Sequence, residues 1–337
     1  MLLRSSRRFR LQKVVRSFLF LVLLVVAVAP VGAADKPEVT VTRLDDRVRV
    51  EIGRELFTEY RFVGNNKPIL YPVIGPKSIG MTRNFPMKKV SGEAEDHPHH
   101  RSLWFTHGDV NGHDFWSEKT DSGKTVHDTF LELSSGKKGV IKTFNKWVDH
   151  TGALQCTDTR TLTFHVIAGT RAIDYEVTLH ASEGKVVLGD TKEGTMGIRT
   201  HPNLRLENNE KRGVTTANGQ AVNSEGGRGK AIWGKRAKWV DYWGTIDGKL
   251  AGVAIFDHPS NPRHPTWWHA RAYGLVAANA FGVHNFESKP AGTGDFTIEP
   301  GATATFRYRF LFHEGDVDRG RIAWQYHQFS SHGDSVE

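Results

Sequence analysis

The stretch from 96 to 116 concentrates residue types that do chemistry: five histidines, one arginine and four aromatic residues. If it is an extended segment leading into a strand, alternate residues share one face, which places His97, His99 and His107 on one surface. Imidazoles titrate near neutral pH, so a cluster of them indicates acid–base or metal chemistry. A strand whose histidines merely end loops is the alternative. For the five histidines taken together, we favour a functional role over this structural one.

A second stretch, 257–269, carries three histidines and three prolines, and the prolines fix the backbone φ and stiffen the loop. The dipeptide His-Pro occurs at 97, 201, 258 and 264, each time at the end of an expected strand. Strand ends of the same sense gather at one rim of a sandwich, where functional loops concentrate. We therefore expect 96–114, His201 and 257–269 to converge on one pocket. A rigid edge connection is the alternative for 257–269.

The favoured chemistry is acid–base catalysis on a carbohydrate, of the epimerase, lyase or hydrolase type. A histidine and a carboxylate would move protons while aromatic rings stack on the sugar. The catalytic candidates are His99, His107, His201, His258, Asp109 and Asp257. The substrate-binding candidates are Arg101, Trp104, Asn111, Trp116, Asn261, His264, Trp267 and His269. This chemistry needs no cofactor, and its partner is a carbohydrate or another small molecule.

Two other functions remain open. One is a non-catalytic sugar-binding module with the same pocket. The other is a metalloprotein in which His97, His99 and either His107 or His201 bind a divalent metal such as Zn, Cu or Fe. A serine hydrolase is disfavoured because Gly-x-Ser-x-Gly is absent, and phosphate-loop and dinucleotide fingerprints are absent too.

The first 34 residues are expected to be a signal peptide. Six basic residues precede an apolar run from 18 to 29, and the small residues 31–34 offer a cleavage site before Asp35. The mature protein is then exported, to the periplasm or the extracellular space. A retained N-terminal membrane anchor is the alternative, but the apolar run is short for a span of about 20 residues. Residues 6–11 half-match a twin-arginine signal, so the export route stays open.

The basic charge comes mostly from that segment. Removing its six positive charges, with no acids among them, lowers the formal net charge from +8 to +2. The remaining basic residues are scattered, so the composition predicts no nucleic-acid partner. Cys156 is the only cysteine, which excludes an intramolecular disulfide. No apolar segment after residue 34 is long enough for a stable membrane span.

Residues 35–337 are expected to form a single all-β domain, a large antiparallel β-sandwich with a C-terminal helix. Short segments rich in Thr, Val, Ile and aromatics follow one another between Gly, Asn and Asp turns, as in 47–52, 139–148 and 303–313. Each sheet must bury one face against another layer. Residues 318–329 have the one helical apolar spacing, and 207–230 is expected to be a long surface excursion, a candidate lid.

Several motifs together resemble a known family. They are Asp96-His97-Pro98-His99-His100-Arg101, Phe256-Asp257-His258-Pro259, Tyr273-Gly274 and Ala278-Asn279-Ala280-Phe281-Gly282. The chain resembles a family of exported bacterial proteins of unknown function, DUF6807, whose members commonly carry the label "PmoA, methane oxygenase". The resemblance covers nearly the whole mature chain and brings no established reaction. It also implies, by analogy, a supersandwich fold like that of galactose mutarotases.

The label does not predict the function. A methane-oxidising membrane subunit needs several apolar spans of about 20 residues, and this chain has none after residue 34.

Overall fold

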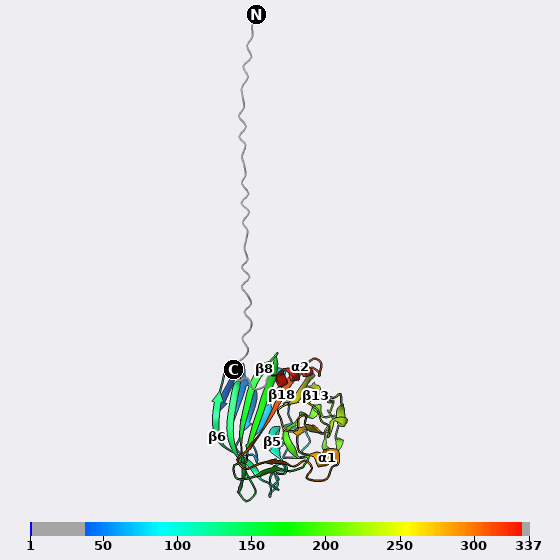
Figure 1. Cartoon of the computed structure of the whole chain (residues 1–337). Coiled ribbons are helices and arrows are strands. Elements are labelled where there is room, and N and C mark those ends of the chain that lie inside the picture. Colours follow the sequence, from blue (N-terminus) through cyan, green and yellow to red (C-terminus); the bar gives the residue numbers. More distant parts are fainter. Residues whose placement is uncertain (2–37, 332–337) are drawn as a thin grey trace. The chain divides into compact units, whose positions relative to one another are not determined.

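The computed structural model of the chain describes Met1 and residues 38–331. The expected signal peptide lies outside these residues apart from Met1, so export stays a prediction. The described part forms two eight-stranded antiparallel sheets, a two-stranded ribbon and a helix near the C-terminus (Figure 1). This confirms the expected all-β sandwich with a C-terminal helix. No helix in the described residues is long and apolar enough to cross a membrane.

The first sheet contains the strands nearest the histidine stretch. In spatial order its strands are β1 (Val39–Arg43), β2 (Arg47–Ile52), β3 (Glu55–Arg61), β4 (Ile69–Val73), β5 (Leu103–His107), β11 (Gly194–Arg199), β16 (Leu275–Asn279) and β15 (Trp267–Ala270). The second sheet contains the long strands of the middle of the chain. Its order is β12 (Gln220–Asn223), β13 (Trp239–Ile246), β14 (Lys249–Asp257), β18 (Thr303–Glu314), β9 (Thr170–His180), β8 (Leu154–Ile167), β7 (Gly139–Val148) and β6 (Lys124–Ser134). The ribbon pairs β10 (Val186–Leu188) with β17 (Phe296–Ile298).

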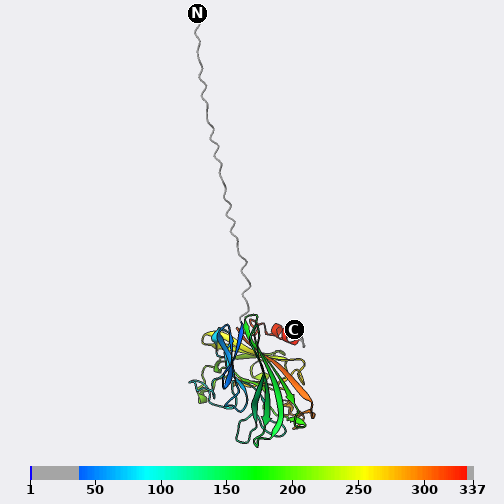
Figure 2. The ribbon, with the colours of Figure 1, turned by 90° about the vertical axis from the view of Figure 1, so that its left-hand side faces the viewer.

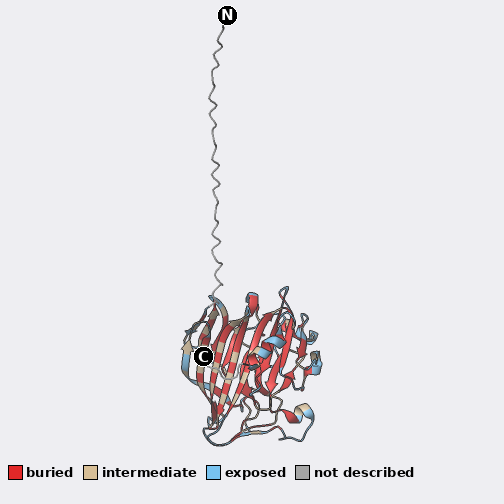
Figure 3. Cartoon of the chain, turned by 45° about the horizontal axis from the view of Figure 1, so that its top comes forward, coloured by how far each residue is buried: buried red, intermediate tan, exposed pale blue. Residues whose placement is uncertain are grey.

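The core lies between the two sheets. In β7 every second residue is buried, as the alternating sequence predicts, and red and tan alternate along the strands in Figure 3. Aromatic side chains join the layers. The Phe57 ring of the first sheet lies 6.0 Å from that of Phe164 in the second, and the Phe105 ring lies 6.1 Å from that of Phe306.

Helix α2 (Ile322–Ser331) covers part of the outer face of the second sheet, on the right in Figure 2. Its Tyr326 and Phe329 rings lie 5.7 and 5.9 Å from the Phe256 ring of β14. The helix begins later than expected, because Arg321 has a left-handed φ of 51°. A short helix that the sequence did not indicate, α1 (Val283–Glu287), follows β16.

The outer face of the first sheet is covered as well. All five residues of β5 are buried, so both faces of the strand are in contact with other parts of the protein. Leu103 and Phe105 point into the main core, whereas Trp104 points outward into a second apolar cluster with Trp116 and Leu275. The histidine stretch packs over this outward face.

Candidate functional site

Aromatic rings stack in a row over the outward side of Trp104. The His100 ring is nearly parallel to the Trp104 ring at 5.5 Å, and the His97 ring is nearly parallel to that of His100 at 4.8 Å. Tyr273 continues the row 5.0 Å beyond His97. Trp104 and Trp116 are at most 1% exposed, so these two candidates lie beneath the row and present no face to a ligand.

The expected extended segment before β5 is wrong, because the chain turns twice there. His97 and Ser102 have left-handed φ values of 45° and 60°. His97, His99 and His107 therefore do not share a strand face. His107 lies in the core, fully buried, with Nε2 2.8 Å from the carbonyl oxygen of Gly189.

A buried ion cluster fixes the histidine loop. Oδ1 of Asp96 accepts from Nη1 of Arg83 at 2.5 Å and from Nη2 of Arg199 at 2.7 Å. Arg83 also donates to the carbonyl oxygens of His97 and His100. Nη1 of Arg199 lies 3.2 Å from Nδ1 of His100. Because a guanidinium only donates, Nδ1 of His100 is the acceptor. Burial and the Arg199 charge hold the pKa of His100 well below its usual range, so His100 is a neutral structural group.

A second ion cluster ties Arg101 to the same loop. The Arg101 guanidinium donates to the Glu118 carboxylate at 2.8 Å, and the fully buried Lys67 ammonium pairs with the same carboxylate. Arg101, expected to bind substrate, therefore already has an acidic partner. Lys67 also lies over the Trp104 ring.

His99 stands apart from these clusters. It is half-buried, its ring contacts are with His97 and His100, and no described residue hydrogen-bonds to its ring nitrogens. Burial lowers the pKa of His99 to about 4, with the Lys67 and His97 charges acting in the same direction. The carboxylates of Glu118 and Glu193 act against this shift. His99 is thus a neutral imidazole at physiological pH, with both nitrogens available.

Glu193 connects His99 to a second imidazole. Burial lowers the pKa of His269 to about 4, and the Glu193 carboxylate opposes this as the largest electrostatic influence. Nδ1 of His269 donates to the carbonyl oxygen of Lys192 at 2.7 Å, which leaves Nε2 as the acceptor of the neutral ring. The Glu193 charge also acts on Tyr273, whose pKa is raised mainly by burial. His269 was among the residues predicted from the sequence, whereas Glu193 and Tyr273 were not.

A cavity of about 320 Å³ opens beside Tyr273. Two half-buried aromatic residues, Tyr273 and Trp233, stand in its wall, and the Trp233 ring lies 6.5 Å from that of His269. The lining residues are Glu207, Lys230, Trp233, Ala270, Arg271, Ala272 and Tyr273. Residues of the expected 207–230 excursion therefore line the cavity. We define the outer-face site as this cavity together with His99, Glu193 and His269.

Other candidates, in the histidine stretch and just after β11, have local structural contacts. Nδ1 of His201 accepts the Asn203 amide at 3.2 Å and caps a short 3-10 turn. Oδ1 of Asp109 accepts the Gly112 amide at 2.9 Å within a turn. The Asn111 side chain accepts from the backbone of the ribbon strand β10 at 2.8 Å.

The 257–269 loop forms its own network, centred on Asp257. Oδ1 of Asp257 accepts from Nδ2 of Asn261 at 2.7 Å. Its Oδ2 lies 2.7 Å from Nδ1 of His264. His264 also lies 3.4 Å from the Tyr326 hydroxyl of α2, and the His258 ring lies 5.1 Å from Phe329 of the same helix. Trp267 is buried, and its indole donates to Glu287.

The expected single pocket is therefore wrong for this loop. Its His258 and His264 contact α2, which covers the outer face of the second sheet, whereas His99 lies over the outer face of the first sheet. The chain passes within this loop from β14 of the second sheet to β15 of the first sheet. The histidines near the end of β14 therefore stay on the side of the second sheet. His269 alone joins the outer-face site, because β15 belongs to the first sheet.

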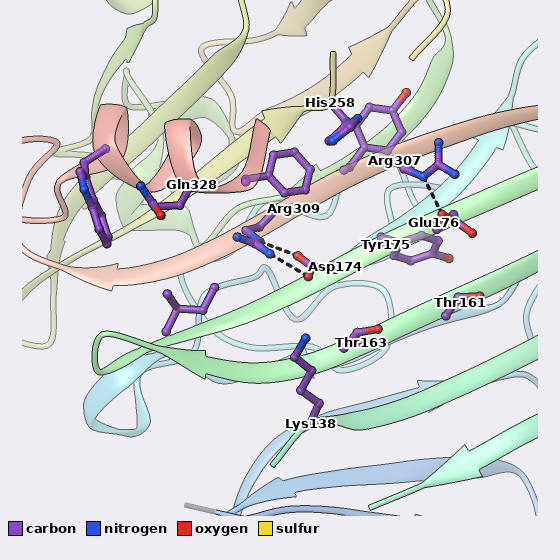
Figure 4. A pocket seen from close by; sticks show the side chains of 14 residues that line it. Lys138, Thr161, Thr163, Asp174, Tyr175, Glu176, His258, Arg307, Arg309 and Gln328 are labelled. Carbon is purple, nitrogen blue, oxygen red and sulfur yellow. Dashed lines mark hydrogen bonds and ion pairs between the residues drawn. The ribbon is translucent and has the colours of Figure 1, made fainter. Parts of the chain in front are cut away.

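A larger cavity of about 630 Å³ lies beside α2, and His258 is in its wall (Figure 4). Figure 4 shows ion pairs across its floor, where Arg309 donates to Asp174 at 2.5 Å and Arg307 to Glu176 at 2.7 Å. Its charged groups on β9 and β18 thus satisfy one another.

The described residues contain no group of three or more His, Cys, Asp or Glu side chains placed to hold a metal ion. His97 and His99 are neighbours, with ring centres 5.8 Å apart, while His201 caps its own turn. The proposed ligand set His97, His99 and His201 is therefore not assembled.

No curated protein matches the chain at a significant level. A solved α-galactosidase from Lactobacillus brevis is similar with 10% identity and a TM-score of 0.36, over 83% of this chain and 40% of that chain. A polysaccharide lyase is similar with 12% identity and a TM-score of 0.33, over 86% of this chain and 34% of that chain.

A galactose mutarotase related enzyme from Lactobacillus acidophilus is similar with 9% identity and a TM-score of 0.30, over 82% of this chain and 97% of that chain. The chain thus spans well under half of the length of the first two proteins. Residues 47–327 match the model described as "Family of unknown function (DUF6807)". Because this match covers most of the sequence, the chain belongs to the DUF6807 family.

Proposed function

We propose that the protein binds a carbohydrate at the outer-face site and transfers a proton to or from it. The observation that supports this best is the influence of one carboxylate, Glu193, on two neutral imidazoles. One of them, His269, has its ring 6.5 Å from that of Trp233 in the cavity wall. Titratable groups with perturbed pKa values that lie close to one another beside a cavity are typical of catalytic sites.

His269 is the proposed general base. The Lys192 carbonyl fixes its tautomer, so that Nε2 carries the free lone pair. When Nε2 takes a proton, the negative charge of Glu193 stabilises the imidazolium that forms. His99 is the second proton-transfer group, because its ring nitrogens have no hydrogen-bond partner among the described residues.

The cavity favours a sugar as the ligand. Its volume of about 320 Å³ lies at the lower end of the range for small-molecule sites. Trp233 and Tyr273 give its wall an apolar part, while the exposed Lys230 and Glu207 give it a polar part. A pyranose has both kinds of surface, with C–H faces that pack on aromatic rings and hydroxyls that take hydrogen bonds.

The test is a panel of neutral and uronic mono- and oligosaccharides, followed by ligand-observed NMR for binding, anomer exchange, new reducing ends and unsaturated products. For the substrate found, Glu193→Gln and His269→Gln should lower kcat by about 10²–10⁴ with little change in binding. The matched control is His258→Gln, on the α2 side of the sandwich, which should keep full activity.

The rate should also fall as the pH drops through about 4, because both imidazoles become protonated there. Binding without turnover would identify a sugar-binding module instead. If no saccharide binds, or if His258→Gln and Glu193→Gln reduce kcat equally, the proposed site is wrong.

A further inference from the structure

The Arg271 guanidinium is held between two aromatic rings in the wall of the cavity. Its central carbon lies 5.8 Å from the Trp233 ring centre and 5.6 Å from that of Tyr273. Cation–π contacts of this kind hold the planar group in place and leave its N–H edge uncovered. Among the described residues, no carboxylate pairs with it and no acceptor hydrogen-bonds to its side chain.

The residues that line the cavity carry one positive charge without a counter-ion among them, and Glu193 of the outer-face site already pairs with Lys192 at 2.7 Å. Three charged residues line it, and two of them, Lys230 and Glu207, form an ion pair with each other. Arg271 is the third, and its side chain is half-buried. A partly desolvated cation without a counter-ion is unfavourable, so a singly charged anion in this cavity gains more than a neutral ligand of the same shape.

We propose that the ligand of the outer-face site is a uronic acid sugar and that Arg271 binds its carboxylate. This rests on the proposed function and names its substrate class. A carboxylate is the singly charged group that matches the two-pronged N–H edge of a guanidinium. A pyranose that carries this group on its ring would place its carboxylate against Arg271, beside Trp233 in the cavity wall.

The proposal links ligand charge to the neighbouring base. The Arg271 cation is one of the groups that lower the pKa of His269 below its usual value, after the larger effect of burial. A bound carboxylate would neutralise that cation, so the pKa of His269 should rise on binding a uronate and should not rise on binding its ester.

The experiment compares galacturonate, glucuronate and mannuronate trisaccharides with their methyl esters, which keep the ring and remove the charge. Calorimetry should show the acids binding about ten- to one-hundred-fold tighter than the esters. Arg271→Met, which keeps the length of the side chain, should abolish this difference by weakening only the acids. Arg271→Lys should keep part of the difference, since lysine retains the charge but lacks the two parallel N–H donors of the guanidinium.

The matched control is Arg321→Met. Arg321 also lies over an aromatic ring, that of Trp324, at 4.4 Å, but it stands beside α2 on the second sheet. This variant should keep the full preference for acids. NMR of His269 should show its pKa rising with the acid alone.

The outcomes separate the two proposals. If acid and ester bind equally to the unaltered protein while Glu193→Gln still abolishes turnover, the inference about Arg271 fails and the proposed function stands. A preference for a sulfated sugar over the uronates would also overturn it. If no saccharide of any kind binds, the proposed function fails and this inference fails with it.

Discussion

Replacing Asp96 by Asn should weaken the fold at the histidine loop more than any other single isosteric change there. One oxygen of Asp96 accepts from both Arg83 and Arg199, and all three side chains are nearly fully buried. Asn keeps the shape but leaves two buried guanidinium groups without their counter-ion. Breaking a buried ion pair from one side costs about 3–5 kcal/mol. We expect a loss of about 3 kcal/mol in the free energy of unfolding, because the amide oxygen still accepts a hydrogen bond.

Urea unfolding measures this loss. With an m-value of about 3 kcal/mol/M for a chain of this size, the midpoint should fall by about 1 M. The matched control is Asp46→Asn, which removes an exposed ion pair with Arg47 and should change stability by less than about 1 kcal/mol. If Asp96→Asn shifts the midpoint no more than this control, the buried cluster does not stabilise the loop.

The pH dependence provides an independent check. Burial works against ionisation of Asp96, but the hydrogen bond from His97 and the charges of Arg199 and Arg83 outweigh it and hold the pKa of Asp96 well below its usual value. A folded-state pKa that is depressed stabilises the protein above the unfolded pKa of about 3.9, and this contribution is lost as the pH falls. The gap between the unaltered protein and Asp96→Asn should therefore narrow below about pH 4.

Two further changes test the packing of the outer faces. Gly197→Ala would place a Cβ 2.9 Å from Cζ2 of Trp104 and should lower the free energy of unfolding in urea by about 1–3 kcal/mol. The control Gly80→Ala, which has open space around it, should not lower it. Equal effects of the two changes would contradict the tight contact at Gly197. Under α2, the His313 ring lies 2.9 Å from Asp241, and although burial lowers the pKa of His313, the Asp241 charge raises it on balance. This stabilisation is present below the unfolded pKa of about 6.5 and is lost as the pH rises through the pKa of the folded state. Asp241→Asn should therefore lower the free energy of unfolding more at about pH 5.5 than at about pH 9. Equal losses at the two pH values would be evidence against the pair.

Strands with one face in the core could be predicted from the sequence. In β7 the alternation of apolar and polar residues matches the alternation of buried and half-buried positions. The strands β15 and β16 were missed because all of their residues are buried, on both faces, so no alternation marks them. They belong to the first sheet, beneath the outer-face site. The sequence therefore predicted the architecture and missed two of the strands that support the site.

The histidine loop was misread for a local reason. An extended segment predicts alternate facing, but His97 and Ser102 adopt left-handed φ values, which no glycine or asparagine signals at those positions. The turn at His97 places its ring in the stack between His100 and Tyr273. Buried ion pairs to Asp96 hold this conformation, and such long-range contacts cannot be predicted from local sequence.

Glu193 could not have been selected from the sequence either. It stands among ordinary charged residues in a turn before β11, with no motif around it. Its importance comes from the sheet order, since β11 lies between β5 and β16 and so brings Glu193 near both His99 and His269. Of the predicted site residues, His99 and His269 were chosen for their residue type and do lie at this site. Whether they catalyse a reaction stays a prediction.

The cavities on the two outer faces differ in whether their arginines already have ion-pair partners. This difference affects how much binding free energy a charged ligand gains in each. Beside α2, in the larger cavity, Arg307 and Arg309 already pair with Glu176 and Asp174. A ligand there must displace a carboxylate held at ion-pair distance before it can use either cation, so its net gain is small. At the outer-face site Arg271 has no such partner among the described residues, and an anion can bind it without breaking an existing contact. For a ligand that carries a carboxylate we therefore propose the smaller cavity, where a half-buried arginine has no ion-pair partner among the described residues.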